Sequence, residues 1–454
     1  MQKIVAKQAL TKNGWETNVE IAIKAGRSVH IRPAAQGAAA TVGLALAAPL
    51  NLHSHAFQRA MSGLTEARGP DPSDSFWTWR RLMYKFLDQL TPDQIQAIAA
   101  QVFLEMLEAG YSSVAEFHYL HHNAGGVPYA NLAELSERIV EAAKDVGIGL
   151  TLLPVLYQFG GLDKRPLAGG QRRFGNDPMQ FARLHEGAAK AVATGPADFN
   201  IGVAPHSLRA VDTLGLSDAL SLAGNGPVHM HLAEQVAEVE EVQAALNARP
   251  TEWLLSNYDV DPRWCLIHCT QMTSEETQAL AKSGAVAGLC PITEANLGDG
   301  IFNGTHYLGH RGNIGFGSDS NVHIALFDEL KSLEYSQRLR DKSRAALATA
   351  DRSTGRVLFE AAARGGAQAG GRESGILAPG KLADILALDL DNEWGANRSG
   401  DMALDTLIFG GHGQRCISDV WSAGRHVVKE GRHVQRERIT KKFTATMAEL
   451  EQNI

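Results

Sequence analysis

Short apolar runs alternate with amphipathic helical stretches along most of this chain, and that alternation limits its possible folds more than any other feature. The runs that we expect to be strands are Leu46–His53, Ser113–His118, Gly149–Leu156, Asn200–Pro205, Pro227–Leu232, Cys265–His268, Ala285–Cys290 and Asn313–Gly317. Helical patterns, such as the one that starts at Thr91-Pro92 and stops at Gly110, lie between them. This alternation predicts an α/β fold with a (β/α)8 TIM-type barrel, although periodicity alone also suits an open doubly wound sheet.

The two ends of the chain share a different pattern, short strand-like runs joined by tight turns. The turn signals are KNGW and KAGRS near the start, and SAGR and KEGR between residues 415 and 432. We therefore expect both ends to form one small β-sandwich domain. The predicted domains are residues 1–47 (sandwich), 48–372 (barrel) and 373–454 (sandwich plus a terminal helix).

Composition excludes several classes of protein. The formal charge of -7 over 454 residues leaves no basic surplus for binding a nucleic acid. We find no signal peptide and no run of eighteen apolar residues, so we expect a cytoplasmic protein with no membrane span. The four cysteines lie mostly in apolar runs, which predicts buried thiols rather than disulfides.

Ionisable side chains follow four of the predicted strands at their carboxyl ends, where TIM barrels place their chemistry. They are His53 and His55, then His229, His231 and Glu234, then His268, and finally Asp319. A single histidine on an apolar strand is usually a core residue, but a set at four strand ends rarely arises by chance. Histidine and carboxylate together are ordinary zinc ligands.

This order of residues resembles the amidohydrolase superfamily over nearly the whole chain, and GKLADILALDL resembles the segment by which such chains return to their β-domain. Members with two metals usually bridge them with a lysine on strand four, and the run Asn200–Pro205 has none. The resemblance therefore implies one Zn²⁺ held by the following residues: His53, His55, His231 and Asp319. His229 competes with His231 because both lie on one strand face, and the H-x-x-E pattern ending at Glu234 favours His231.

The same resemblance implies three catalytic roles. Asp319 would take a proton from the attacking water, Glu234 would carry a proton to the substrate nitrogen, and His268 would polarise or protonate the reacting centre. The H-x-x-E pattern resembles the branch of the superfamily whose members expel ammonia.

Several local runs, among them NLHSHAFQRAMSGLTE, HMHLAEQ, CPITEANLGDGIF and GSDSNVH, resemble the formimidoylglutamate deiminase family of bacterial histidine degradation. That family converts N-formimino-L-glutamate and water to N-formyl-L-glutamate and ammonia. The resemblance implies that the substrate-binding residues are Gln58, Arg80, Tyr119, His206 and Arg209. A small dicarboxylate substrate fits two arginines, since a guanidinium pairs well with a carboxylate.

Two other functions fit parts of the sequence. An aminohydrolase acting on guanine or a related heterocycle would use the same zinc machinery, but would need aromatic stacking rather than cationic anchors. A non-catalytic barrel scaffold is disfavoured because every expected ligand is present. The helical pattern at residues 441–451 could pack on a partner chain, which leaves a homodimer open.

Two local expectations concern loops. We expect His121 and His122 to lie in a solvated loop and not to form a second metal site, because adjacent residues cannot easily converge. At the end of the seventh predicted strand, the run Cys290–Glu294 departs from the expected small hydroxyl residue near Pro291, so we expect a difference in the local backbone geometry.

Overall fold

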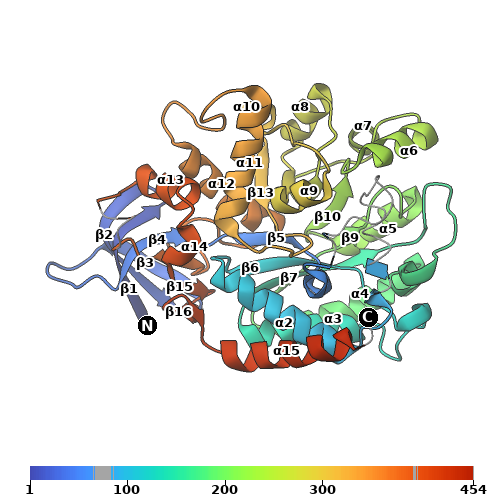
Figure 1. The fold of residues 1–454 in the computed structure, drawn as a ribbon, viewed down its shortest axis with the longest axis horizontal. Helices are drawn as coiled ribbons and strands as arrows, with labels where there is room; N and C mark the ends of the chain where they lie inside the picture. Colours follow the sequence, from blue (N-terminus) through green and yellow to red (C-terminus); the bar gives the residue numbers. More distant parts are fainter. Residues whose placement is uncertain (65, 67–82, 85, 392–394, 396, 453–454) are drawn as a thin grey trace.

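The computed structural model describes residues 1–64, 66, 83, 84, 86–391, 395 and 397–452, and these form a mixed α/β fold (Figure 1). One parallel sheet contains β5 (Leu50–Ser54), β6 (Ser113–His118), β7 (Gly149–Leu156), β8 (Asn200–Ile201) and β9 (Ala204–Pro205). A second parallel sheet contains β10 (Val228–Leu232), β11 (Trp264–His268), β12 (Val286–Leu289) and β13 (Asn313–Phe316). Isolated parallel bridges, Ser54 to Asp319 and Val203 to Val228, join the two sheets at both ends.

Helices follow these strands along the chain. They are α2 (Pro92–Glu108), α3 (Glu134–Val146), α4 (Pro178–Val192), α5 (Thr213–Ala223), α6 (Val236–Leu246), α7 (Pro250–Asn257), α8 (Ser274–Ser283), α9 (Pro291–Leu297), α10 (Gly304–Gly309), α11 (Leu326–Asp341) and α12 (Thr354–Ala369). The sequence signals for α2 are confirmed: Thr91 caps it through a capping box with Gln94, and the chain turns away at Gly110 with φ 98°.

Both ends of the chain contribute to one eight-stranded sheet, as the turn signals predicted. Its order is β17-β16-β15-β14-β4-β1-β2-β3. The strands are β1 (Gln2–Thr11), β2 (Gly14–Lys24), β3 (Arg27–Pro33), β4 (Val42–Ala47), β14 (Ile385–Leu388), β15 (Ile417–Ser422), β16 (Arg425–Lys429) and β17 (Arg432–His433). Two-residue turns with positive φ at both positions, such as Ala25-Gly26 and Ala423-Gly424, close its hairpins.

The first barrel-type strand was predicted to begin at Leu46, and this boundary is wrong. Leu46 and Ala47 end β4 and pair with Leu386 and Ile385 of β14 in the eight-stranded sheet, whereas β5 begins at Leu50. The apolar run is continuous because both strands are buried, so hydrophobic periodicity could not detect the break between them.

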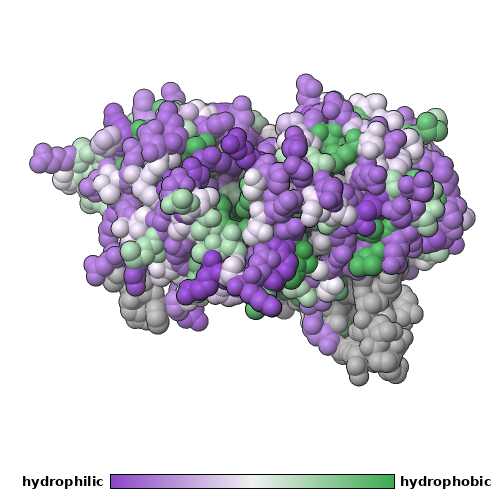
Figure 2. Space-filling model, turned by 90° about the horizontal axis from the view of Figure 1, so that it is seen from above, coloured by the Kyte–Doolittle hydropathy of each residue, from purple (hydrophilic) through white to green (hydrophobic). Residues whose placement is uncertain are grey.

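The terminal helix α15 (Arg436–Glu451) packs along α2 of the same chain, below it in Figure 1. Thr440 donates a hydrogen bond to Gln101 (3.1 Å), and Arg436 pairs with Glu108. In the described parts, no helix combines the length and apolarity needed to span a membrane. The face in Figure 2 is mainly hydrophilic, with hydrophobic residues in small groups. All four cysteines are buried, and none forms a disulfide.

A buried ion-pair network joins the eight-stranded sheet to the parallel strands. Arg372 donates two hydrogen bonds to the Asp384 carboxylate, at 2.6 and 2.9 Å, and a third to Asp198 (3.0 Å). Arg425, on β16, pairs with the same Asp198 at 2.6 Å. Asp384 also accepts the backbone N–H of Ala423. Asp384 is the first aspartate of the GKLADILALDL segment, so that sequence signal marks the junction of the two parts.

We predict that Arg372→Met lowers the free energy of unfolding by about 3–5 kcal/mol. The substitution removes a guanidinium that pairs with Asp384 and Asp198, and both carboxylates would stay buried. Urea denaturation measures this change. Lys190→Met, which removes an exposed pair with Glu186, serves as the control and should leave stability unchanged. Equal effects of the two substitutions would contradict this account of the junction.

Candidate active site

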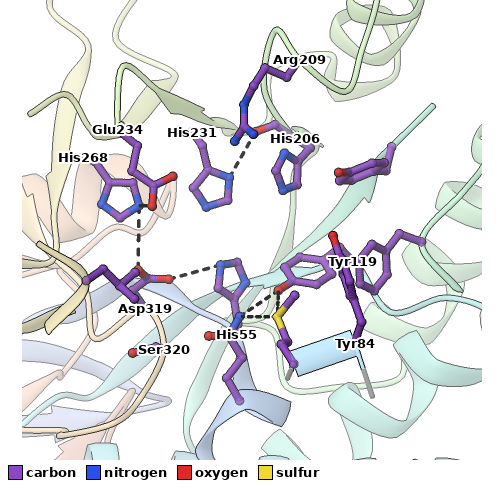
Figure 3. A pocket seen from close by; sticks show the side chains of 15 residues that line it. His55, Tyr84, Tyr119, His206, Arg209, His231, Glu234, His268, Asp319 and Ser320 are labelled. Atoms are coloured by element: carbon purple, nitrogen blue, oxygen red, sulfur yellow. Dashed lines mark hydrogen bonds and ion pairs between the residues drawn. The ribbon is translucent and has the colours of Figure 1, made fainter. Parts of the chain in front are cut away.

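Four of the predicted residues, His53, His55, His231 and Asp319, converge at the carboxyl ends of β5, β10 and β13. Figure 3 shows the last three of them. Nε2 of His53 lies 3.1 Å from Nε2 of His231 and 3.4 Å from Oδ1 of Asp319. Nε2 of His55 lies 3.2 Å from the same Oδ1 atom. All four side chains are buried. His53 lies on β5 and His55 follows its last residue, Ser54, and the spacing of two residues brings both imidazoles to one side of the chain.

Backbone carbonyls fix the orientation of two of these rings. Nδ1–H of His55 donates to the carbonyl of Phe117 (3.1 Å), and Nδ1–H of His231 donates to that of His206 (3.2 Å). Each bond leaves the Nε2 lone pair directed at the centre of the cluster. Burial lowers the pKa of His53 to about 3 and that of His231 well below its usual value, so both rings are neutral electron-pair donors at pH 7.

Asp319 sits in a sharp turn after β13, with φ 47°. Its N–H donates to the carbonyl of His53 (2.9 Å), and its own carbonyl accepts the N–H of His55 (3.0 Å). Burial alone would raise the pKa of the Asp319 carboxyl, but the neighbouring imidazoles of His53 and His55 outweigh it and hold that pKa well below its ordinary range. The carboxylate is therefore ionised.

Buried side-chain hydrogen bonds tie this turn to β5. Asn51 donates to the hydroxyl of Ser318 (2.7 Å), which donates to Asn321 (2.6 Å). Asn321 in turn donates to the hydroxyl of Ser54 (3.1 Å). These residues flank the Ser54–Asp319 bridge, so they fix Asp319 relative to the two histidines of β5.

The donor set fits a divalent zinc ion. Zinc–ligand bonds of about 2.0–2.1 Å in a tetrahedron place neighbouring donor atoms about 3.3 Å apart. Three separations in the cluster, His53 to His231, His55 to Asp319 and His53 to Asp319, are 3.1, 3.2 and 3.4 Å. Three imidazoles and a carboxylate are also an ordinary zinc ligand set.

His229, the competing ligand on β10, lies outside this cluster. Its Nε2 atom is 2.8 Å from the carbonyl oxygen of Ala369, at the end of α12, and the ring is buried. The geometry therefore brings His231 to the other donors and directs His229 to the opposite end of the strands.

His268 and Glu234 lie beside the cluster. Nε2 of His268 is 3.8 Å from a carboxylate oxygen of Glu234 and 3.8 Å from Oδ2 of Asp319. Burial alone would lower the pKa of His268, but Glu234 and Glu294 raise it well above its usual value. Burial raises the pKa of Glu234. Shifted pKa values beside a pocket are typical of groups in functional sites.

A buried carboxylate that the sequence analysis missed supports Glu234. Glu238, on α6, accepts the N–H of Glu234 (2.9 Å) and the N–H of Ala233 (3.3 Å). Ala233 has φ 50°, which is costly for a residue with a side chain. Glu238 stabilises this turn, and the turn presents Glu234 to the site.

A pocket opens above the cluster, and four predicted substrate-binding residues line it: Gln58, Tyr119, His206 and Arg209. Gln58 donates to the hydroxyl of Tyr119 (2.8 Å). Arg80, and its neighbour Arg81, lie outside the described residues. The sequence analysis did not assign roles to further lining residues, which are Met83, Tyr84, Tyr157, Phe174, Leu297 and Ser320. Tyr157 follows β7 directly, so its place at a strand end was the available signal.

The expectation of a solvated loop at His121 and His122 is wrong, since both side chains are buried. Their backbone N–H groups donate to the carbonyl of Arg173, and their Nε2 atoms lie 2.9 and 2.8 Å from the carbonyls of Val155 and Gly175. The rings bond to separate carbonyls and do not converge. The sequence analysis interpreted this run of polar residues as a surface loop. The buried carbonyl groups to which the residues bond come from distant segments, so the sequence could not reveal them.

Thr293 lies on α9, two residues after Pro291. Its Oγ1 atom lies 3.0 Å from the hydroxyl of Ser320 and 3.3 Å from the carbonyl oxygen of Ser318. Thr293 thus links the end of β12 to the turn that carries Asp319.

Comparisons with known proteins agree with this geometry. Residues 44–427 match the amidohydrolase family, and residues 1–41 match the N-terminal domain of formimidoylglutamate deiminase HutF. A formimidoylglutamate deiminase of Pseudomonas aeruginosa is 48% identical over 99% of this chain and 100% of its own length. An 8-oxoguanine deaminase of the same species is 26% identical over 84% of each chain.

Solved structures resemble the whole fold. A crystal structure of an amidohydrolase from Brucella melitensis superposes with a TM-score of 0.95 at 48% identity, covering 99% of this chain and 100% of the other. A structure of an adenosine deaminase from Xanthomonas campestris with bound zinc gives a TM-score of 0.82 at 19% identity, covering 99% and 98% of the two chains.

We predict that His231→Gln weakens zinc binding at least about 10-fold, because it removes a ring whose orientation a backbone carbonyl fixes. Titration of the metal-free protein with zinc and a competing chelator measures the affinity. His229→Gln, on the same strand, should retain the wild-type affinity. The opposite pattern would assign the ligand to His229.

Proposed function

This chain belongs to the amidohydrolase family, and we propose that it is a formimidoylglutamate deiminase, a hydrolase that acts on a C–N bond in histidine degradation. It would convert N-formimino-L-glutamate and water to N-formyl-L-glutamate and ammonia. The observation that carries this proposal is a buried histidine–aspartate cluster at the floor of a pocket with Arg209 on its wall. Similarity over the full length to a deiminase of this name supports the substrate.

We propose that the two parallel sheets form one closed (β/α)8 barrel over residues 48–372, with a β-sandwich built from residues 1–47 and 373–454. The Ser54–Asp319 and Val203–Val228 bridges support closure. A separate small core on one face of β1, β2, β4 and β14 supports the sandwich.

One Zn²⁺ is the proposed cofactor, and its ligands would be His53, His55, His231 and Asp319. When bound, zinc would act as a Lewis acid that lowers the pKa of a water molecule toward neutrality. The absence of a lysine on β8 and β9 supports a single metal ion.

The protein's own groups would then move the protons. Asp319 would accept a proton from the attacking water, since its carboxylate is ionised. His268 would donate a hydrogen bond from Nε2 to the reacting centre of the substrate as its carbon atom becomes tetrahedral. Glu234, whose pKa burial raises, would deliver a proton to the departing nitrogen so that ammonia leaves neutral.

Arg209 would bind one substrate carboxylate, and Arg80 would bind the other. His206, Gln58 and Tyr119 would add hydrogen bonds along the substrate. In Figure 3, Arg209 and His206 lie above Tyr119 and Tyr84, and the ring centroids of His206 and Tyr119 are 6.1 Å apart.

Deamination of an aromatic heterocycle is the second candidate. One observation favours it: four aromatic side chains line the pocket, namely Tyr84, Tyr119, Tyr157 and Phe174. A flat ring could stack on them. The guanidinium of Arg209 favours an anionic substrate instead.

We predict that the zinc-loaded protein releases ammonia rapidly from N-formimino-L-glutamate, and slowly or not at all from guanine and N-formimino-L-aspartate. Asp319→Asn should abolish this release, because it removes the proton acceptor and weakens metal binding. Release of ammonia from guanine alone would contradict the claim that the pocket binds a dicarboxylate. Full turnover by the Asp319→Asn variant would discard the proposed machinery.

We also predict that Arg209→Met lowers kcat/KM about 10- to 100-fold, through the loss of a charge-assisted hydrogen bond to a carboxylate. Steady-state ammonia release gives this value. Lys164→Met is the matched control, since Lys164 pairs with Asp212 at the surface and does not line the pocket. If both variants match the wild type, the carboxylate anchor lies elsewhere.

A further inference from the structure

Glu294 lies behind His268, on the side away from the pocket, and none of the proposed catalytic roles uses it. Its Oε1 atom is 3.2 Å from Nδ1 of His268, and both side chains are almost completely buried. The same oxygen accepts the backbone N–H of Cys290 at 2.8 Å. We propose that Glu294 is a positioning residue that fixes the ring of His268 so that Nε2 faces the reacting centre. This inference rests on the proposed function.

The carboxylate of Glu294 is itself held rigidly. Glu294 lies on α9, which begins at Pro291, and its backbone N–H donates to the carbonyl of Cys290 (2.9 Å). Its side chain then reaches back to the N–H of Cys290. The backbone and the side chain of Glu294 are thus both hydrogen-bonded at the end of β12. The carboxylate therefore stays in place if the ring of His268 rotates.

His268, in contrast, needs a support. It has φ 71° and is followed by Cys269 with φ 53°, a turn that residues with side chains rarely adopt. The Glu294 oxygen that accepts the N–H of Cys290 is also the acceptor for His268, so Nδ1 carries the hydrogen. The bond then leaves Nε2 on the side of Glu234 and Asp319, each 3.8 Å away.

A second metal site is the alternative for these residues, since donor atoms of His268, Cys290 and Glu294 all lie within 4.8 Å of one another. Two observations favour positioning. The Glu294 oxygen already accepts two N–H groups. Burial raises the pKa of the Cys290 thiol well above its usual value, which disfavours the thiolate that a metal needs.

The test compares Glu294→Ala and Glu294→Gln in the zinc-loaded enzyme. We expect Glu294→Ala to lower kcat about 10- to 100-fold with KM within about twofold, the usual range for a group that orients a catalytic histidine. Glu294→Gln keeps an acceptor oxygen, so we expect a smaller loss, and it remains informative if the alanine variant does not fold. A rise in KM with unchanged kcat would overturn the proposal.

A double-mutant cycle separates positioning from general packing. In a His268→Asn background, adding Glu294→Gln should lower kcat no further than about twofold, because the residue that it serves is gone. Additive losses would overturn the proposal. Glu329→Gln is the matched control, because Glu329 is buried and accepts the N–H of Ile292 on the same helix without contacting His268. An equal loss of kcat in this control would also overturn it.

Two readouts do not depend on the substrate. The imidazole N–H proton of His268 should be visible by NMR in the wild-type protein, and absent in Glu294→Ala because the site would open to exchange. Zinc content should stay at one per chain in both Glu294 variants. A persisting signal, or loss of a second zinc ion, would overturn the positioning role. Failure of the wild-type protein to release ammonia, with the NMR result as expected, would instead discard the proposed substrate.

Discussion

Asp319 places a negative charge among three imidazoles in a region that is closed to solvent. Burying a carboxylate is costly unless neighbouring groups compensate it. Here Nε2 of His53 and Nε2 of His55 lie 3.4 and 3.2 Å from Oδ1 of Asp319, and Nε2 of His268 lies 3.8 Å from Oδ2. The backbone of Asp319 is tied at the same time to both histidines of β5. The positions of the donor atoms therefore depend on the pairing between the ends of β5 and β13. A change in the register of this pairing would separate the histidines from Asp319.

The strand ends that carry the site are strained, and buried carboxylates from the following helices support them. Glu238 accepts a hydrogen bond from the backbone at Ala233, and Glu294 bonds to the imidazole ring of His268. Each carboxylate comes from the helix after a strand, so the strand–helix alternation supplies both the reacting groups and their supports. The strain is visible in the backbone, because Ala233, His268 and Asp319 all have positive φ values.

Most of this site could be predicted from the sequence, because its residues sit at strand ends with regular spacing. His53 and His55 share a face through the two-residue period, and β6 and β7 match their predicted bounds. Glu238 and Glu294 could not be found this way, since their roles depend on turns that no periodicity encodes. The boundary at Leu46 failed because two buried strands follow each other without a polar break, and the family resemblance supplied what spacing alone left open at His229 and His231.

The most direct test of the account is a crystal structure of the zinc-loaded protein with anomalous scattering recorded at the zinc edge. The account predicts one strong peak, about 2.0–2.1 Å from Nε2 of His53, His55 and His231 and from a carboxylate oxygen of Asp319. A peak bound to His229, or a second peak between His268, Cys290 and Glu294, would contradict it.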